Sequence, residues 1–203
     1  MTPPTSGSRP YHHGNLRTAL VEASFALIAE HGLAEFSVAK AARAVGVSTA
    51  SPYRHFADRD HLLAAVAAQA ALELADRMRA DADAAGTDPR ERLAATAGTY
   101  VRYVAERGVG LDVIFSAPLT RLEQPELAGA GRRLTDLLFE LAEAAGPPGS
   151  AAALTLLERH LVTAHGYVTL LREGFFSNRR PKDTVDSVAA RAIDASRDLV
   201  VRG

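Results

Sequence analysis

The chain has 203 residues, of which 47% are hydrophobic, and its formal net charge at pH 7 is −1. This composition favours a globular protein of one or two domains and excludes a disordered or fibrous chain. Cysteine is absent, which excludes disulfide scaffolds, thiolate zinc sites and cysteine nucleophiles. No apolar stretch reaches the roughly 18 residues of a membrane span, and the first ten residues lack a signal-peptide core. We therefore expect a cytoplasmic protein.

The sequence predicts an all-α fold, because alanine is its most abundant residue and runs of β-branched or aromatic residues are scarce. Residues 1–12 are rich in Pro, Ser and Thr without periodicity, so we expect a flexible N-terminal arm. Apolar residues then recur every three or four positions from Leu16 to Leu27. This spacing predicts a helix that ends at Gly32, a residue that tolerates the positive φ of a helix C-terminus.

Two short helices are expected next, joined by a Gly-Val-Ser turn. Ser37 is the candidate N-cap of a helix over residues 38–45, and a second helix is expected from Ser48 or Thr49 to Phe56. Helices of about eight residues are not stable alone, so they must pack against flanking helices. The pattern predicts a helix-turn-helix inside a three-helix bundle at residues 13–60.

Longer helical segments follow and are expected to form a second domain over residues 61–203. Asp58 is the candidate N-cap of the first of them, which runs towards Met78. Gly- and Pro-containing breaks, among them Pro118, separate the others. The expected segments cover about 88–107, 111–116, 123–145, 151–174 and 183–201. With the N-terminal elements they give about nine helices in total.

Charge is distributed unevenly between the two parts. The first 65 residues carry six basic and five acidic residues, against 17 and 19 in the remainder, and they hold five of the seven histidines. Lys40 and Arg43 share one face of the first short helix, whereas Arg54, His55 and Arg59 lie on or just after the second. Such donors bind DNA phosphates. A solvated helix face also accounts for Lys40 and Arg43.

Several of these segments together resemble the N-terminal domain of TetR-family transcriptional regulators. The matching segments are Tyr11-His-His-Gly-Asn-Leu-Arg17, Phe36-Ser-Val38, Val45-Gly-Val-Ser48 and Tyr53-Arg-His-Phe56, followed by Asp58-Arg59 and Leu62. The resemblance implies a homodimeric regulator that binds double-stranded DNA. We expect it to be a repressor that a small-molecule effector releases from a palindromic operator.

The resemblance also implies roles for individual residues. Ser37 would cap its helix and bond a phosphate, while Tyr53 and His55 would contact phosphates on either side of the groove. Arg59 stands where the family usually has lysine. Base edges would be faced by Thr49, Ala50 and Ser51. These side chains are small, so Arg54 or Lys40 is expected to add to the recognition of the bases. The complete expected set is Ser37, Lys40, Arg43, Ser48, Thr49, Ala50, Ser51, Tyr53, Arg54, His55 and Arg59.

The second domain is similar to a regulatory domain in which a Trp-x-x-x-His-Gly pattern recurs. This chain has Thr163-Ala-His-Gly166, with Leu161 in place of the tryptophan. The residues expected to line an effector pocket are Tyr100, Tyr103, Phe115, Phe139 and His165. Core packing is the alternative for each aromatic residue, and a hydrogen-bonded core or interface position is the alternative for His165.

Two C-terminal segments are expected to form the dimer interface. Residues 151–174 carry two apolar stripes, which require two neighbours. Residues 183–201 offer one apolar face, consisting of Val185, Val188, Ala192, Ala195 and Leu199. Together the segments predict half of a four-helix interface across a two-fold axis.

Two other functional classes compete with a DNA-binding regulator: an all-α enzyme, and a helical adaptor that binds a protein. The sequence contains no Gly-rich phosphate loop, no Gly-x-Ser-x-Gly and no His-Glu-x-x-His. We therefore expect no enzymatic activity, no cofactor and no metal. His12 and His13 are adjacent on the expected arm, where their side chains diverge, and are not expected to form a metal site.

Overall fold

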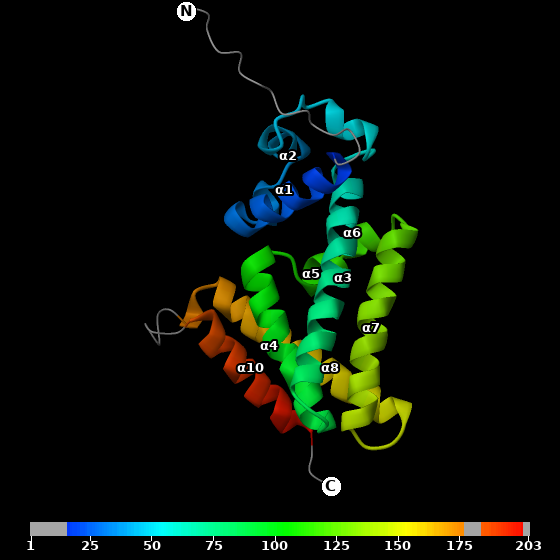
Figure 1. Ribbon diagram of the computed structural model, residues 1–203, viewed down its shortest axis with the longest axis vertical. Coiled ribbons are helices and arrows are strands. Elements are labelled where there is room, and N and C mark those ends of the chain that lie inside the picture. The colour runs from blue at the N-terminus through cyan, green and yellow to red at the C-terminus, as the bar shows by residue number, and fades with distance from the viewer. Residues whose placement is uncertain (1–15, 177–183, 201–203) are drawn as a thin grey trace, which may run out of the picture.

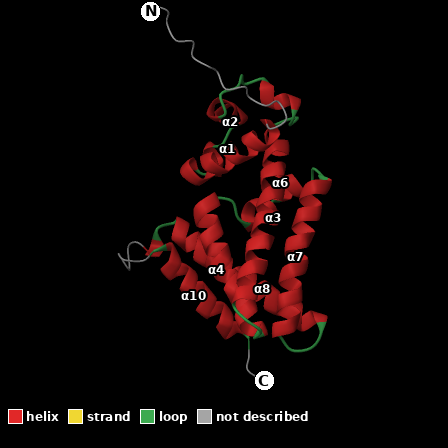
Figure 2. Ribbon diagram, in the orientation of Figure 1, coloured by secondary structure: helices red, strands yellow, loops and turns green. Residues whose placement is uncertain are grey.

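Figure 1 shows the computed structural model, which describes residues 16–176 and 184–200. Every regular element in these residues is helical, as Figure 2 shows, so the all-α prediction is confirmed. The expected N-terminal arm, with His12 and His13, lies outside the described residues.

The N-terminal unit contains α1 (Leu16–His31), η1 (Leu33–Glu35), α2 (Val38–Ala44) and η2 (Ser51–Arg54). Gly32 ends α1 with a φ of 79°. The Ser37 side chain accepts a hydrogen bond from the Lys40 amide at 3.2 Å, which confirms it as the N-cap of α2. Phe25, Val38 and Phe56 are buried in the core.

The second short helix differs from the prediction. The sequence predicts a helix from Ser48 or Thr49 to Phe56, whereas the structure has only a 3-10 turn at η2. Pro52 has no amide proton with which to donate to the Ser48 carbonyl, and the Ser51 amide bonds that carbonyl instead, at 3.0 Å. The short i to i+3 pattern therefore replaces an α-helical first turn.

A single long helix, α3 (Arg59–Ala84), runs from the N-terminal unit into the remainder of the molecule (Figure 1). The Asp58 carboxylate accepts from the His61 amide at 2.9 Å, which confirms Asp58 as its N-cap. The helix crosses the boundary predicted between residues 60 and 61. The two parts of the chain are therefore joined by a continuous helix rather than by a loop.

The larger bundle contains, among the described residues, α4 (Pro89–Arg107), α5 (Leu111–Ile114), α6 (Ala117–Thr120), α7 (Pro125–Ala145), α8 (Ser150–Arg172) and α10 (Val185–Leu199). Their bounds lie within a few residues of the expected segments. The exception is α6, because Pro118 was expected to break the chain and instead lies in the first turn of this helix, where proline is tolerated.

Helix α4 lies at the centre of the bundle and packs against α3, α7, α8 and α10. Its buried residues include Leu93, Val101 and Tyr100. A Cβ at Gly98 would lie 2.6 Å from the Ile193 Cδ1 atom, so the absence of a side chain at Gly98 allows α10 to approach closely. A large part of the core is therefore built on this one helix.

A buried polar network joins α4, α8 and α10. His160, which is 1% exposed, lies with Nε2 2.9 Å from the Thr96 hydroxyl and Nδ1 2.6 Å from the Ser196 hydroxyl. Thr96 donates its only proton to the Leu93 carbonyl, so Nε2 donates to Thr96 and Nδ1 accepts from Ser196. Burial lowers the pKa of His160 to about 4 and keeps the ring neutral at pH 7.

This network predicts a pH-dependent stability. The unfolded chain binds a proton at His160 near pH 6.5, while the folded chain binds it only near pH 4. The contribution of neutral His160 to the free energy of unfolding is therefore complete above about pH 6.5 and decreases as the pH falls from there towards 4. We expect a loss of about 2 kcal/mol between pH 7.5 and pH 5, measured by urea denaturation.

His160→Gln should remove this pH-dependent loss, because the variant side chain does not titrate. His31 is exposed at the end of α1, so His31→Gln is the matched control and should retain the loss. An identical pH profile for His160→Gln and the unchanged protein would contradict the interpretation.

Candidate functional site

The turn from α2 to α3 presents a row of exposed side chains. Thr49, Ala50, Arg54 and His55 are exposed, and Tyr53 is 57% exposed although it is a large aromatic residue. Pro52 lies between them and Phe56 follows them, and both side chains are buried and anchor the segment to the core. The predicted base-facing residues, with Tyr53 and His55, thus lie on one short, anchored turn, whereas Ser37 lies at the start of α2.

Ser48 and Ser51 lie at the start of this turn. Their hydroxyl oxygens are 2.8 Å apart, and either hydroxyl can donate to the other. Ser48 is exposed and Ser51 is half-buried. The pair stiffens the turn while it leaves hydroxyl oxygens at the surface.

Two of the predicted DNA-contacting cations are engaged within the chain. Lys40 Nζ donates to the Glu35 carbonyl at 2.8 Å and lies 3.1 Å from the Glu35 carboxylate. Arg59 donates from Nη2 to the Leu33 carbonyl at 3.1 Å and from Nε to the Phe36 carbonyl at 3.4 Å. The Arg59 guanidinium also lies 5.6 Å from the centre of the Phe36 ring. Both residues hold the turn that precedes α2.

Arg43 and Arg54 differ from these two residues. Both are exposed, and neither side chain has a hydrogen bond or ion pair with another described residue. Their guanidinium groups are therefore available for a ligand without the loss of an internal contact. The sequence spacing alone does not show that Lys40 and Arg59 have internal partners. Those partners are the Glu35 carboxylate and the backbone carbonyls of residues 33, 35 and 36.

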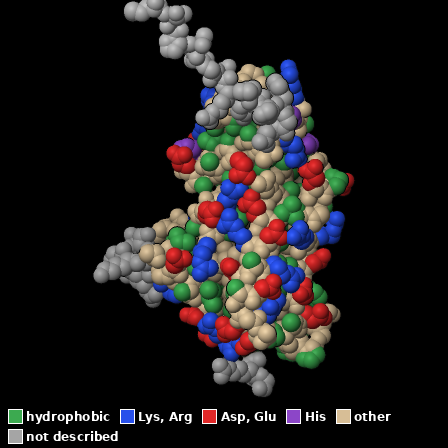
Figure 3. Space-filling view, viewed as in Figure 1, with side chains coloured by type: hydrophobic (Ala, Val, Ile, Leu, Met, Phe, Trp, Pro, Cys, Tyr) green, Lys and Arg blue, Asp and Glu red, His purple; other side chains and the backbone are tan. Residues whose placement is uncertain are grey.

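Charged side chains attach the N-terminal unit to the bundle at two places on α1. Near the middle of α1, Arg107 from the end of α4 lies 3.1 Å from Glu22 and 3.0 Å from Glu73, with its guanidinium 3.8 Å from the Phe25 ring. At the N-terminal end of α1, Arg17 lies 2.6 Å from Glu126 at the start of α7. Figure 3 shows acidic and basic side chains gathered on this face of the molecule.

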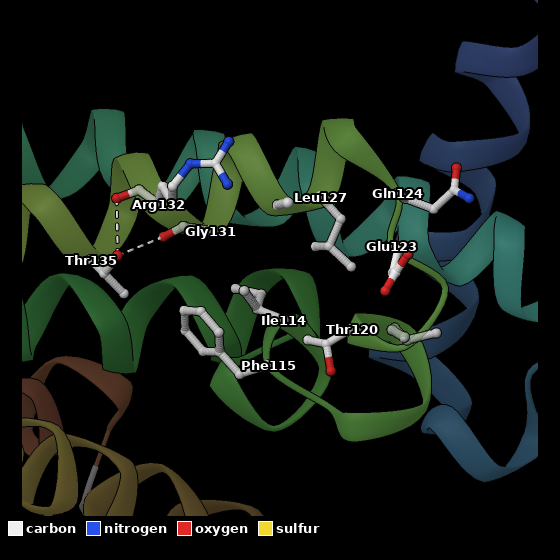
Figure 4. A pocket seen from close by; sticks show the side chains of 11 residues that line it. Ile114, Phe115, Thr120, Glu123, Gln124, Leu127, Gly131, Arg132 and Thr135 are labelled. Carbon is white, nitrogen blue, oxygen red and sulfur yellow. Dashed lines mark hydrogen bonds between the residues drawn. The ribbon is translucent and has the colours of Figure 1, made fainter.

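A cavity of about 230 Å³ lies between α5, α6 and α7 (Figure 4). Ile114, Phe115, Leu119 and Leu127 contribute apolar wall, and Arg132 is the one lining cation. Phe115 is 43% exposed. Of the five residues predicted to line an effector pocket, only Phe115 lines this cavity. The amphipathic segment at 123–145 was the signal that could have indicated Leu127 and Arg132.

The other four predicted pocket residues lie elsewhere. Tyr100 and His165 come together, because the Tyr100 hydroxyl accepts from the Leu111 amide at 3.0 Å and lies within hydrogen-bond distance of His165 Nδ1, at 2.9 Å. Burial raises the pKa of Tyr100 to about 12. Tyr103 is buried, and its hydroxyl donates to the Glu73 carboxylate at 3.1 Å. Desolvation raises the pKa of Tyr103 well above its ordinary value. Phe139 packs against the core.

No group of three or more His, Asp or Glu residues within residues 16–176 and 184–200 could hold a metal ion. None of the helices there is long and apolar enough to cross a membrane.

A short helix followed by an exposed basic turn, joined by one long helix to a larger helical bundle, is an arrangement that suits a DNA-binding regulator. Residues 20–66 match the family model "Bacterial regulatory proteins, tetR family". Residues 93–196 match the model "Tetracyclin repressor-like, C-terminal domain". The chain belongs to the TetR family of bacterial regulatory proteins, as the resemblance indicated.

Relatives agree with this assignment. The HTH-type transcriptional regulator BetI from Stenotrophomonas maltophilia is 34% identical over 126 residues, which are 61% of this chain and 63% of that protein. A protein of unknown function from Rhodococcus sp. RHA1 superposes with a TM-score of 0.74 at 28% identity, covering 96% of this chain and 100% of that one. A TetR-family regulator from Streptomyces coelicolor shares the fold, with a TM-score of 0.61, 20% identity, and coverage of 92% and 99%.

The contacts of Arg59 predict a structural role that can be measured. Arg59→Met keeps the aliphatic stem but removes the donors to the Leu33 and Phe36 carbonyls. We expect a loss of about 1 kcal/mol of stability, together with faster hydrogen exchange at the α2 amides. Arg54→Met is the matched control, because Arg54 has no partner among residues 16–176 and 184–200, and it should leave both quantities unchanged. Equal stabilities for the two variants would contradict this role.

Proposed function

We propose that this protein is a homodimeric, ligand-responsive transcriptional regulator that acts in the cytoplasm, as a repressor, on a palindromic operator. The observation that carries the proposal is the anchored turn at η2, which holds Thr49, Ala50, Tyr53, Arg54 and His55 exposed. Phosphate contacts supply most of the affinity for DNA, and base-edge contacts supply the sequence preference. One turn with both kinds of side chain fits both requirements.

The exposed side chains divide between these two tasks. Thr49 and Ser51 can donate to or accept from a base edge, and the Ala50 methyl group can contact a thymine methyl. Tyr53, His55 and the Ser37 hydroxyl suit phosphates. Arg43 and Arg54 have free guanidinium groups and suit either phosphate or guanine. Lys40 and Arg59 use part of their donor capacity inside the chain, and contact with DNA through their remaining donors stays a prediction.

Removal of a phosphate contact should change how DNA binding depends on salt. We expect Arg43→Ala and Arg54→Ala to weaken binding to operator and random duplex alike. Where the lost contact is to a phosphate, the slope of log affinity against log salt should fall by about 1. Fluorescence anisotropy over a series of salt concentrations, with DNA from the flanks of the protein's own gene, measures this slope.

Arg79→Ala is the charge-matched control, since Arg79 lies on α3 about 30 Å along the helix from Arg59. It should leave both the affinity and the slope unchanged. Binding to the flanking DNA no tighter than to random duplex would contradict the proposal and favour the adaptor interpretation. Turnover of a small molecule by the purified protein would favour the enzyme interpretation.

A dimer through α8 and α10 is supported by exposed apolar residues on α8. Leu154 is 52% exposed and Val162 is 73% exposed, although both are aliphatic. The apolar face of α10 has a different partner, because Val188 and Ala192 are fully buried within the chain and α10 packs against α4. We therefore assign the apolar centre of the dimer interface to α8, with α10 at its edge.

Val162→Glu should convert the dimer to a monomer, because it would bury a carboxylate at the two-fold axis. Light scattering after gel filtration measures the mass. Leu72→Glu is the matched control, since Leu72 on α3 is 38% exposed and lies on a different helix, and it should leave the dimer intact. A dimeric Val162→Glu protein would contradict the assignment.

The cavity between α5, α6 and α7 is the proposed effector site. Its apolar wall suits the body of a small organic molecule, and Arg132, Glu123 and Thr135 supply polar contacts. Glu126 begins α7 directly beside this wall and pairs with Arg17 of α1. A ligand that shifts α7 therefore acts on the DNA-binding unit, to the extent that it binds one arrangement more tightly than the other.

A further inference from the structure

A second cavity, of about 460 Å³, lies where the DNA-binding unit meets the bundle. Ile28 of α1 and Leu33 of η1 form one wall, Val101 and Val104 of α4 form another, and Val168 and Leu171 of α8 complete it. In Figure 1 the C-terminal end of α4 lies next to α1. The volume falls within the range of small-molecule sites, about 300–1,000 Å³.

Two charged side chains of the described residues line this cavity, Arg172 and Asp112. Arg172 donates from Nη2 to the Gly108 carbonyl at 2.5 Å and from Nη1 to the Asp112 carboxylate at 3.3 Å. A guanidinium has five N–H donors, so three remain for a ligand. Arg172 is thus fixed in the cavity wall by a carbonyl while most of its donors are unused.

The two charges are held differently, although their side chains are similarly exposed. The Gly108 carbonyl holds the guanidinium in place at 2.5 Å, whereas the Asp112 carboxylate has one contact with Arg172, at 3.3 Å. Asp112 can turn into water when an anion takes its place beside Arg172. The fixed charge of the cavity is therefore positive, and a carboxylate can pair with it through two parallel hydrogen bonds.

We propose that this junction cavity binds a small organic carboxylate with an apolar body, its carboxylate paired with Arg172. The apolar body would lie against the valines and leucines of α4 and α8. This site is separate from the effector cavity between α5, α6 and α7, because the two share no lining residue.

The position of the cavity couples its occupancy to DNA binding. Residues of α1 and η1 form one side, so the shape of the cavity depends on the separation of α1 from α4. Gly108 fixes that separation, because its φ is 71° and a Cβ there would lie 2.6 Å from the Ala29 Cα atom. Arg172 binds the carbonyl of this same glycine. A ligand on Arg172 therefore acts at the contact between the two units, which is a form of regulation that rests on the proposed function.

Three probes with the same body test the site by calorimetry on the full chain without DNA: 4-phenylbutanoate, 4-phenylbutan-1-ol and 4-phenylbutylamine. We expect the carboxylate to bind at least about tenfold more tightly than the alcohol and the amine. Arg172→Gln should remove this preference, and Arg172→Lys should retain part of it because the charge remains. Equal affinity for the three probes, no binding of the carboxylate, or an unchanged preference in Arg172→Gln would overturn the proposal.

Two variants distinguish the cavities. Ala105 is an exposed residue that lines the junction cavity, so Ala105→Phe fills that space without removal of a buried side chain and should abolish carboxylate binding. Gly131→Leu narrows the cavity between α5, α6 and α7 and should leave carboxylate binding unchanged. Loss in Gly131→Leu with retention in Ala105→Phe would overturn the assignment.

Operator titration separates this inference from the proposed function. Carboxylate binding that depends on Arg172, in a protein without specific DNA binding, would support the site and contradict the proposed function. Specific DNA binding without carboxylate binding would overturn the site alone. Carboxylate binding that leaves operator affinity unchanged would overturn the coupling between the units.

Discussion

The contact between the C-terminal end of α4 and α1 is the constraint on which the arrangement of the two units depends. Gly108 approaches the backbone of Ala29 so closely that no side chain fits there. Beside it, Arg107 is shared between the carboxylates of Glu22 and Glu73 and lies over Phe25. A partly buried guanidinium loses hydration, and two carboxylates and an aromatic ring compensate for that loss. One charged side chain therefore connects α1, α3 and α4.

The exposed turn at η2 and both cavities lie close to contacts that α1 makes. The exposed turn at η2 is anchored through Pro52 and Phe56, and the turn that precedes α2 is held by Lys40 and Arg59. Helix α1 contacts α4 through the Glu22–Arg107 ion pair and contacts α7 through the Arg17–Glu126 ion pair. Both cavities border one of these contacts. Under the two proposals made above, a ligand in either cavity would act on α1 directly, with no helix required to transmit the change over a long distance.

The sequence predicted much of the DNA-binding unit because its signals are local. Ser37 and Asp58 cap helices through residues three positions away, and the Gly-Val-Ser turn and the Tyr-Arg-His-Phe segment identify the family. The effector pocket was less accessible to sequence reasoning. Tyr103 and Phe139 have the side chains that pockets use, but partners far along the chain, such as Glu73, hold Tyr103 in the core. Arg172 lies at the end of α8 and gains its role only from Gly108 and Asp112.

The sequence by itself determined the all-α class, the family and most helix bounds, since periodicity, capping and Gly or Pro breaks act within a few residues. The tertiary structure decided which charged groups are free, which apolar face of the C-terminal helices remains exposed, and where cavities form. Arg54 and Arg59 look alike in the sequence, yet only Arg59 meets carbonyls from residues 33 and 36. Likewise, the apolar face of α10 is buried on α4 while Val162 of α8 stays exposed. These outcomes depend on contacts between residues distant in sequence, which local patterns do not specify.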